Sequence, residues 1–539
     1  MDDCSLANIN RRKLYLVCVA LALVTLLLYA KVCSYPFFSF DEDDYVINNP
    51  HIEHGLTLGD IAWSFTSIEA FNWHPVTWLS HMLVATFFGM DPGAHHLANI
   101  LIHTISSILL LFLLFRMTGQ LWPSSFVAFL FAIHPMHVES VAWVAERKDV
   151  LSAFFGFTTL LLYVRYIAKH KTGLYFLSLF SFLLCLMSKP MLVTLPAVML
   201  LVDFHTLRRH PSQAGESATV RPWRWYGALL TEKIPFLACS LLSSYITIYA
   251  QNKGGALDYV NQPSLMSRMD NALVSYVKYI CKIFYPIDLS VLYPMPAVFP
   301  LWQVGGSLVI LILFSAAAIA FRRTKPYLAF GWFWFVITLV PVIGFIRFGA
   351  QSMADRYTYI PAIGIFIIVA WGISDMLDTF RYKKYLLVFS ACATIALSAA
   401  LTWRQTTYWK TSVALFRHSL QVNPDNYMLN NCLGIEFAKH GYVDAAVKRF
   451  REALRINPND SFAHNNLGRI FANNGEFDTA IAEYNEALRL NPNLAIAKKN
   501  LAEVVTAKNN YYDRGTNPPA VDFRNALFPN SSSQTSIRR

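Results

Sequence analysis

The apolar stretch that decides the fold is the first one in the chain, LYLVCVALALVTLLLYAKVC, from Leu14 to Cys33. Its length matches the roughly 20 residues with which a helix crosses a hydrocarbon core. The basic triplet Arg11-Arg12-Lys13 precedes it, so a secretory signal peptide is the alternative. The stretch is longer than a signal core and ends without a small-x-small cleavage site, which favours a retained span.

Similar apolar runs recur along the chain, near residues 96–115, 121–141, 150–168, 173–187, 190–204, 234–250, 303–321, 327–346, 358–376 and 385–402. With the first run they predict an all-α membrane bundle of about 11 spans. The composition agrees, since 55% of the residues are hydrophobic and 15% are charged. The net charge of +11 comes from short basic clusters between the runs, a pattern typical of membrane proteins. We therefore expect membrane lipid, and no nucleic acid, among the partners.

The basic clusters also predict the orientation. If Arg11-Arg12-Lys13 lies in the cytoplasm and the spans alternate, the clusters at 169–171, 322–325 and 381–384 are cytoplasmic as well. This topology requires residues 271–285 to lie along the outer surface or to be re-entrant. It makes residues 34–95 an extracytoplasmic loop, which contains eight acids and no Lys or Arg. The predicted location is a bacterial inner membrane with a periplasmic loop, or the ER membrane with a luminal one.

A repeat of 34 residues follows the last apolar run. Asn423-Pro424, Asn457-Pro458 and Asn491-Pro492 mark its period, and Leu433-Gly434 and Leu467-Gly468 recur within it. This pattern is typical of tetratricopeptide (TPR) repeats, which stack as helix pairs into an α-solenoid. We expect about three repeats, whose groove binds an acceptor protein. An odd number of spans places them on the same side of the membrane as the acidic loop.

These features divide the chain into five segments. We expect an N-terminal tail and first span at 1–33, the acidic loop at 34–95, a multi-span membrane domain at 96–408, TPR repeats at 409–508 and a disordered tail at 509–539.

The acidic loop begins with four consecutive carboxylates, Asp41 to Asp44, soon after the first span. Adjacent carboxylates repel one another unless a cation or a basic partner lies nearby. A solvated charge run is the plain alternative, but Phe37, Phe38, Phe40 and Tyr45 flank the acids and argue against it. A divalent cation held by Asp41, Glu42 and Asp44 is one hypothesis, because hard cations bind carboxylate oxygens.

Several motifs together resemble one known superfamily. They are Asp41-Glu42 with Asn48-Asn49-Pro50, Asn72-Trp73-His74-Pro75, His95-His96-Leu97-Ala98-Asn99, residues 134–140 (HPMHVES), Glu146-Arg147-Lys148-Asp149, Ser188-Lys189-Pro190 and Asp355-Arg356-Tyr357. The chain resembles the GT-C glycosyltransferases that use polyprenyl-phosphate sugars, and most of all the TPR-containing O-mannosyltransferases and their bacterial relatives. It departs from them in having Asp41-Glu42 in place of an Asp-Asp pair, and in having fewer repeats.

The resemblance implies a transfer from a polyprenyl-phosphate-linked sugar to a hydroxyl group. Such a reaction needs a base for the acceptor proton and positive charge for the leaving phosphate. Asp41 is the predicted base, with Glu42 and Asp44 as further catalytic candidates. The predicted substrate- and phosphate-binding residues are His74, His96, His137, Arg147, Lys148, Lys189, Arg356 and Tyr357.

Other functions remain open from the sequence alone. A membrane-anchored TPR scaffold for envelope protein or polysaccharide assembly would explain the repeats without catalysis. A flippase would place ionisable residues in mid-span, whereas here they cluster at the predicted outer ends. The many histidines lack zinc-site spacing, so we expect no histidine-bound metal. No P-loop is present in the sequence, which favours a lipid-linked donor.

Overall fold

The structure is a computed structural model that describes residues 11–38, 40–205, 222–253, 263–296, 298–345 and 351–514. The first ten residues, the part of the predicted 509–539 tail from residue 515 onward and the side chain of Asp44 lie outside this description.

The N-terminal part contains α2 (Arg11–Tyr29), η1 (Ala30–Ser34), η2 (Asp43–Ile47), α3 (Pro50–Glu53), α4 (Leu58–Thr66), η3 (Glu69–Phe71) and α5 (Pro75–Phe88). The next part contains α6 (Pro92–Thr118), α7 (Leu121–Ile133), η4 (Pro135–His137), α8 (Val138–Ala142), η5 (Val144–Glu146), α9 (Arg147–Lys169), α10 (Thr172–Ser188), η6 (Pro190–Thr194), α11 (Leu195–His205) and α12 (Pro222–Lys253).

The chain continues with α13 (Leu265–Phe284), β1 (Tyr293–Pro294), α14 (Leu301–Ala320), α15 (Pro326–Leu339), η8 (Val340–Val342), β2 (Gln351–Met353), η9 (Asp355–Thr358), α16 (Ala362–Met376) and α17 (Lys383–Tyr408). Last come α18 (Ser412–Val422), α19 (Tyr427–Lys439), α20 (Val443–Ile456), α21 (Ser461–Asn473), α22 (Phe477–Leu490) and α23 (Ala495–Arg514). The fold is helical apart from one short antiparallel pair, β1 with β2, in the described residues.

Six of the described helical segments are long and apolar enough to cross a membrane: Arg11–Ser34, Pro92–Thr118, Val144–Lys169, Leu229–Lys253, Leu301–Ala320 and Lys383–Tyr408. The pair Leu121–Ile133 and Pro135–Ala142, bent by 50°, forms a seventh if it counts as one span. The structure thus gives six or seven long spans where the sequence predicts about 11. The other four runs coincide with the shorter apolar helices α10, α11, α15 and α16, whose 10–17 residues fall below the length of a straight span.

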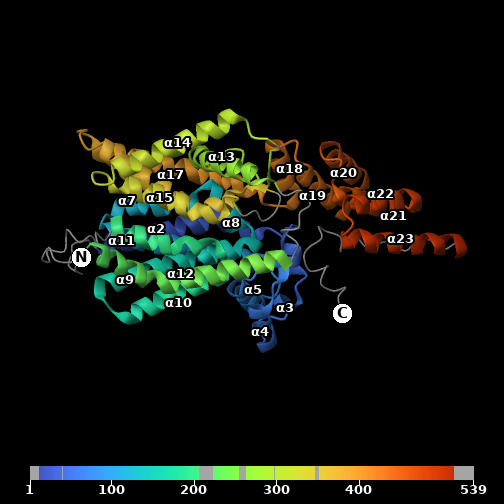
Figure 1. The fold of residues 1–539 in the computed structure, drawn as a ribbon, viewed down its shortest axis with the longest axis horizontal. Coiled ribbons are helices and arrows are strands. Elements are labelled where there is room, and N and C mark those ends of the chain that lie inside the picture. The colour runs from blue at the N-terminus through green and yellow to red at the C-terminus, as the bar shows by residue number, and fades with distance from the viewer. Residues whose placement is uncertain are drawn as a thin grey trace.

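The helices of the membrane part lie side by side along the long axis of the molecule (Figure 1). The N-terminus is at one end, and the repeat helices α18–α23 extend from the other end, where α3, α4 and α5 also lie. Two glycines allow a close crossing within the bundle, because a Cβ at Gly331 of α15 would lie 2.3 Å from the carbonyl oxygen of Gly364 in α16. The segment 271–285 forms most of α13 and its C-cap Tyr285, and α13 is not among the candidate spans.

The repeat region consists of helix pairs, as the 34-residue period predicts. Pairs α19/α20 and α21/α22 correspond to the two complete repeats, and the N-cap residues Asn426 and Asp460 accept backbone N–H groups at the starts of α19 and α21. The repeated glycines permit tight packing within each pair, since a Cβ at Gly434 would lie 2.6 Å from the ring of Phe450. Helix α23 runs to Arg514, beyond the predicted end of the repeats at residue 508.

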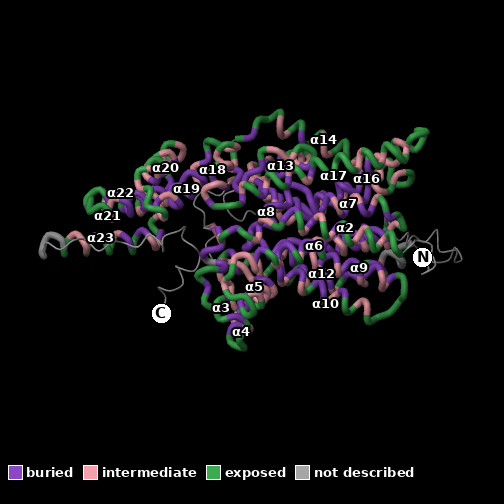
Figure 2. The backbone as a smooth tube through the Cα atoms, turned by 180° about the vertical axis from the view of Figure 1, so that it is seen from behind, coloured by how far each residue is buried: buried purple, intermediate pink, exposed green. Residues whose placement is uncertain are grey.

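The first repeat helices share a core with the membrane part. Trp409, Phe416, Leu429 and Leu433 are buried in the same apolar cluster as residues of α2, α6 and α7. Figure 2 shows the buried residues continuing from the bundle into α18 and α19. The repeats are therefore attached to the membrane part by packing as well as by the chain connection.

Candidate functional site

The acidic loop is held against the start of α9 by Glu42. Its two carboxylate oxygens accept the backbone N–H groups of Phe38 at 2.5 Å and Val144 at 2.7 Å, and its side chain is fully buried. Burial raises the pKa of Glu42 to about 8, although the N–H groups of Phe38, Val144 and Ala145 favour its charged form. Both oxygens are engaged with the backbone, so Glu42 fixes the position of its neighbour Asp41.

Asp41 lies within electrostatic range of several basic residues. The residue is partly exposed, and the charges of Lys148, Lys189 and Arg356 favour its ionised form. Burial is the larger effect and raises the pKa of Asp41 above the ordinary aspartate value, and the charge of Glu146 raises it further. A carboxylate with a raised pKa is a stronger base than an ordinary aspartate.

The three basic residues come from three separate segments. Lys148 lies in the first turn of α9, Lys189 at the break between α10 and η6, and Arg356 on η9 before α16. The sequence predicted all three as phosphate-binding residues, and the fold brings them together within electrostatic range of Asp41.

Glu146 lies at the centre of this cluster. Its carboxylate oxygens lie 3.3 Å from Nζ of Lys148, 3.0 Å from Nζ of Lys189 and 3.3 Å from Nε of Arg356. The Glu146 side chain is only 2% exposed. Glu146 is not among the site residues predicted from the sequence, although it is the first residue of the Glu146-Arg147-Lys148-Asp149 motif.

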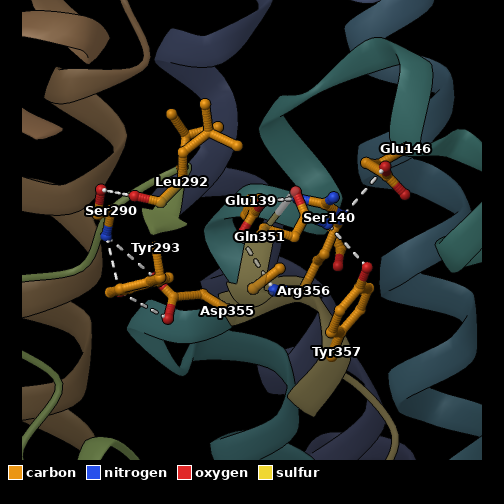
Figure 3. A network of polar contacts seen from close by, with 12 residues as sticks. Glu139, Ser140, Glu146, Ser290, Leu292, Tyr293, Gln351, Asp355, Arg356 and Tyr357 are labelled. Carbon is orange, nitrogen blue, oxygen red and sulfur yellow. Dashed lines mark hydrogen bonds and ion pairs between the residues drawn. The ribbon is translucent and has the colours of Figure 1, made fainter. Parts of the chain in front are cut away.

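Two further carboxylates complete the network. Asp149 lies 2.6 Å from Nζ of Lys189 and accepts a hydrogen bond from Ser140. Glu139 pairs with the guanidinium of Arg356 and accepts its backbone N–H at 3.0 Å. Figure 3 shows Arg356 directed toward Glu139 and Glu146. We use the name cation cluster for the set of Lys148, Lys189, Arg356, Glu139, Glu146 and Asp149.

Asp355 points away from the cation cluster, toward the segment before β1 (Figure 3). It accepts hydrogen bonds from the hydroxyl of Tyr293 at 3.0 Å and from the backbone N–H of Ser290 at 3.3 Å. The same segment contacts the repeats, because the backbone N–H of Val291 donates to Oγ of Ser419 at 3.3 Å. The chain around Arg356 is thus tied to the first repeat helices.

His74 is connected to Lys148 through Tyr45. Its Nδ1 is 3.2 Å from the hydroxyl of Tyr45, and Nζ of Lys148 lies over the Tyr45 ring at 4.7 Å from the centroid. Burial, together with the charges of Lys148 and Lys189, lowers the pKa of His74 well below its usual value. A neutral imidazole therefore supports the tyrosine beside the cation cluster.

Three predicted residues contact other parts of the fold. The guanidinium of Arg147 is fully buried and donates to Oδ1 of Asn99 at 2.8 Å and to the carbonyl of His95 at 2.6 Å. His137 shares a hydrogen bond between its Nδ1 and the carbonyl of Phe131 at 2.7 Å, and His96 is fully buried in the first turns of α6. These side chains pack and connect helices.

Tyr357, by contrast, lies beside the cation cluster. The guanidinium carbon of Arg356 is 5.2 Å from its ring centroid, and its hydroxyl accepts a hydrogen bond from Gln351 at 2.8 Å. It therefore supports Arg356 from the side of β2.

The described residues contain no group of three or more His, Cys, Asp or Glu side chains arranged to hold a metal ion. The proposed cation ligands were Asp41, Glu42 and Asp44, of which Asp44 has no described side chain. Each oxygen of Glu42 already accepts a backbone N–H group, which occupies part of its capacity to bind a cation.

The repeats match a known family model. A tetratricopeptide repeat model covers residues 433–495, which include most of α19 and all of α20, α21 and α22. This match confirms the repeats that the 34-residue period predicts.

About three quarters of the chain is similar to several protein O-mannosyl-transferases. It is 24% identical to the protein O-mannosyl-transferase F38B6.6 of Caenorhabditis elegans, over 75% of this chain and 57% of the relative. It is 24% identical to human protein O-mannosyl-transferase TMTC1, over 72% of this chain and 49% of the relative. Human protein O-mannosyl-transferase TMTC4 is also 24% identical, over 76% and 62% respectively. The match thus spans about half to three fifths of the length of these relatives, and the chain is a distant homologue of the TPR-containing protein O-mannosyltransferases.

Proposed function

We propose that this chain is an integral-membrane glycosyltransferase that moves a sugar from a polyprenyl-phosphate donor to a hydroxyl group of an acceptor protein or glycan. The distant homology to protein O-mannosyltransferases supports the reaction class. The observation that carries the proposal is that Lys148, Lys189 and Arg356 meet at Glu146, within electrostatic range of Asp41. A base near basic side chains that can bind a phosphate is the arrangement that transfer from a lipid phosphate needs.

In the proposed reaction, Asp41 takes the proton of the acceptor hydroxyl. The acceptor oxygen attacks the anomeric carbon, and the bond from that carbon to the phosphate oxygen breaks with inversion, as a single displacement of the GT-C type. The electron pair remains on the lipid phosphate, whose added negative charge Lys148, Lys189 and Arg356 stabilise. Glu42 positions Asp41 through its backbone hydrogen bonds.

We further propose that the four shorter apolar helices complete about 11 spans and that this site faces the periplasm or the ER lumen. The contact between Lys439 and Asp43 supports a shared side for the acidic loop and the repeats. The TPR groove would then recruit the acceptor protein close to Asp41.

The proposal is tested first in cells and then with the purified chain. Profiling of intact glycans and glycopeptides with and without the gene should identify a missing modification and its acceptor. The chain in nanodiscs should then transfer mannose from polyprenyl-phosphate mannose to that acceptor, but not from a nucleotide sugar. Absence of both transfer and release of polyprenyl phosphate would contradict the proposal, and would leave a non-catalytic TPR scaffold as the better account.

A further inference from the structure

The cation cluster has an unusual centre, because one buried carboxylate is shared by three basic side chains from different segments. Glu146 lies within 3.3 Å of nitrogen atoms of Lys148, Lys189 and Arg356. Its backbone is fixed as well, since Glu42 binds the N–H of Val144 at the start of η5. A negative group held among three cations has the surroundings that a phosphate group would need.

The three cations differ in their other partners. Lys189 also pairs with Asp149, and Arg356 also pairs with Glu139. Within the described part of the chain, Glu146 is the one carboxylate in ion-pair contact with Lys148, whose Nζ also lies over the Tyr45 ring. Lys148 therefore loses least when it turns from Glu146 to another anion.

We infer that Glu146 is an internal anion that occupies part of the place of the donor's phosphate, and that Glu146 and the lipid phosphate compete for Lys148. This inference rests on the proposed function. In the absence of donor, Glu146 keeps the three cations in position. After transfer, its charge weakens the hold on the lipid phosphate product, so that the product leaves. Glu146 is thus a positioning residue that sets the affinity for phosphate.

A purely structural role for Glu146 predicts the opposite change in binding. If Glu146 only anchors the cations, its neutralisation lets them move apart and weakens phosphate binding. If Glu146 competes with phosphate, neutralisation removes the competing charge and strengthens binding. Glu146→Gln separates the two, because the amide has nearly the same shape without the charge.

The experiment measures binding of farnesyl phosphate to the purified full-length protein in nanodiscs. Farnesol is the control for binding through the isoprenoid, and inorganic phosphate is the control for binding through the anion. For Glu146→Gln we expect lower thermal stability without ligand and a dissociation constant for farnesyl phosphate about tenfold below that of the wild type. In turnover, kcat should fall and inhibition by the lipid phosphate product should strengthen. Farnesol should have no effect on either protein.

Asp203→Asn is the matched control, because it also removes a charge from a buried ion pair. Asp203 lies 2.8 Å from Nζ of Lys233, and both side chains are fully buried between α11 and α12. This variant should lose stability without a change in the dissociation constant for farnesyl phosphate.

The outcomes separate this inference from the proposed function. If the wild type binds farnesyl phosphate and Glu146→Gln binds it equally or more weakly, the inference is wrong while the proposed donor stands. If the wild type does not bind farnesyl phosphate at all, the proposed function itself is contradicted. Equal responses to inorganic phosphate and farnesyl phosphate would show a general anion site and would also overturn the inference.

Discussion

Nζ of Lys439, at the end of the first helix of the first complete repeat, lies 2.9 Å from the carboxylate of Asp43 in the acidic loop. Asp43 is two residues from Asp41, so this ion pair joins the repeats directly to the candidate catalytic segment. Its partly buried side chains make it more than a surface contact.

Neutralising this ion pair should weaken the coupling between the repeats and the loop. We expect Asp43→Asn to lower kcat/KM for a protein acceptor by about two- to fivefold, the range given by ion pairs worth up to about 1 kcal/mol. Transfer to a short peptide acceptor should change less, because it does not need the repeats. The swapped double variant Asp43→Lys with Lys439→Asp should recover part of the loss; equal losses with both acceptors would argue against coupling.

The effect of a C-terminal truncation on stability, lipid phosphate binding and transfer should depend on where the chain is cut. Deleting residues 427–539 removes Leu429 and Leu433, which are buried in the core of the membrane part. We expect that variant to lose thermal stability and binding of lipid phosphate. Deleting residues 461–539 keeps the α19/α20 pair, so it should bind lipid phosphate normally and lose transfer to the protein acceptor.

Both truncations are compared with the full chain by thermal unfolding in nanodiscs and by transfer to protein and peptide acceptors. Normal modification of the protein acceptor by the shorter chain ending at 460 would show that the later repeats do not recruit it.

The pH dependence of kcat/KM should report the raised pKa of Asp41. A general base acts only when ionised, so activity falls as the pH drops through its pKa. Burial raises this pKa, which places the acidic limb above the ordinary aspartate value of about 4. The charge of Lys148 lowers the pKa of Asp41, so Lys148→Gln should move the limb to higher pH. Lys439→Gln serves as the control and should leave the acidic limb at the same pH. An acidic limb that stays in place in Lys148→Gln would show that Lys148 does not affect the pKa of the base.

The proposed topology predicts the sides of the membrane on which reporters lie. Fusions after residues 60, 260 and 410 should be extracytoplasmic, and a fusion after residue 215 should be cytoplasmic. A cytoplasmic signal from the fusion at 410 would separate the repeats from the acidic loop and contradict the ion pair between Asp43 and Lys439.

Periodic features of the sequence were sufficient for much of the fold. The 34-residue period predicted the repeat pairs, and the long apolar runs predicted the long spans. Local hydropathy could not distinguish the shorter helices α10, α11, α15 and α16 from full spans, because an apolar run can continue past a helix end, as the run 327–346 continues beyond the end of α15 at Leu339.

Part of the candidate site could be predicted from the sequence. The motifs shared with the GT-C superfamily include Asp41, Lys148, Lys189 and Arg356, so these residues could be predicted. The fold brings the three basic residues together, within electrostatic range of Asp41. Arg147 lies one residue from Lys148, yet the two side chains have different partners, a difference that depends on helix orientation. The contacts of Glu146 join three segments that are distant in the sequence, so only the structure reveals these contacts.

The most direct test of the account is the rate of transfer from polyprenyl-phosphate mannose by Asp41→Asn in nanodiscs, with thermal stability measured on the same preparation. An amide of nearly the same shape cannot take the acceptor proton, so we expect a loss of about 10²- to 10⁴-fold in kcat with unfolding close to that of the wild type. Near-normal turnover by Asp41→Asn would show that Asp41 is not the general base of the proposed transfer.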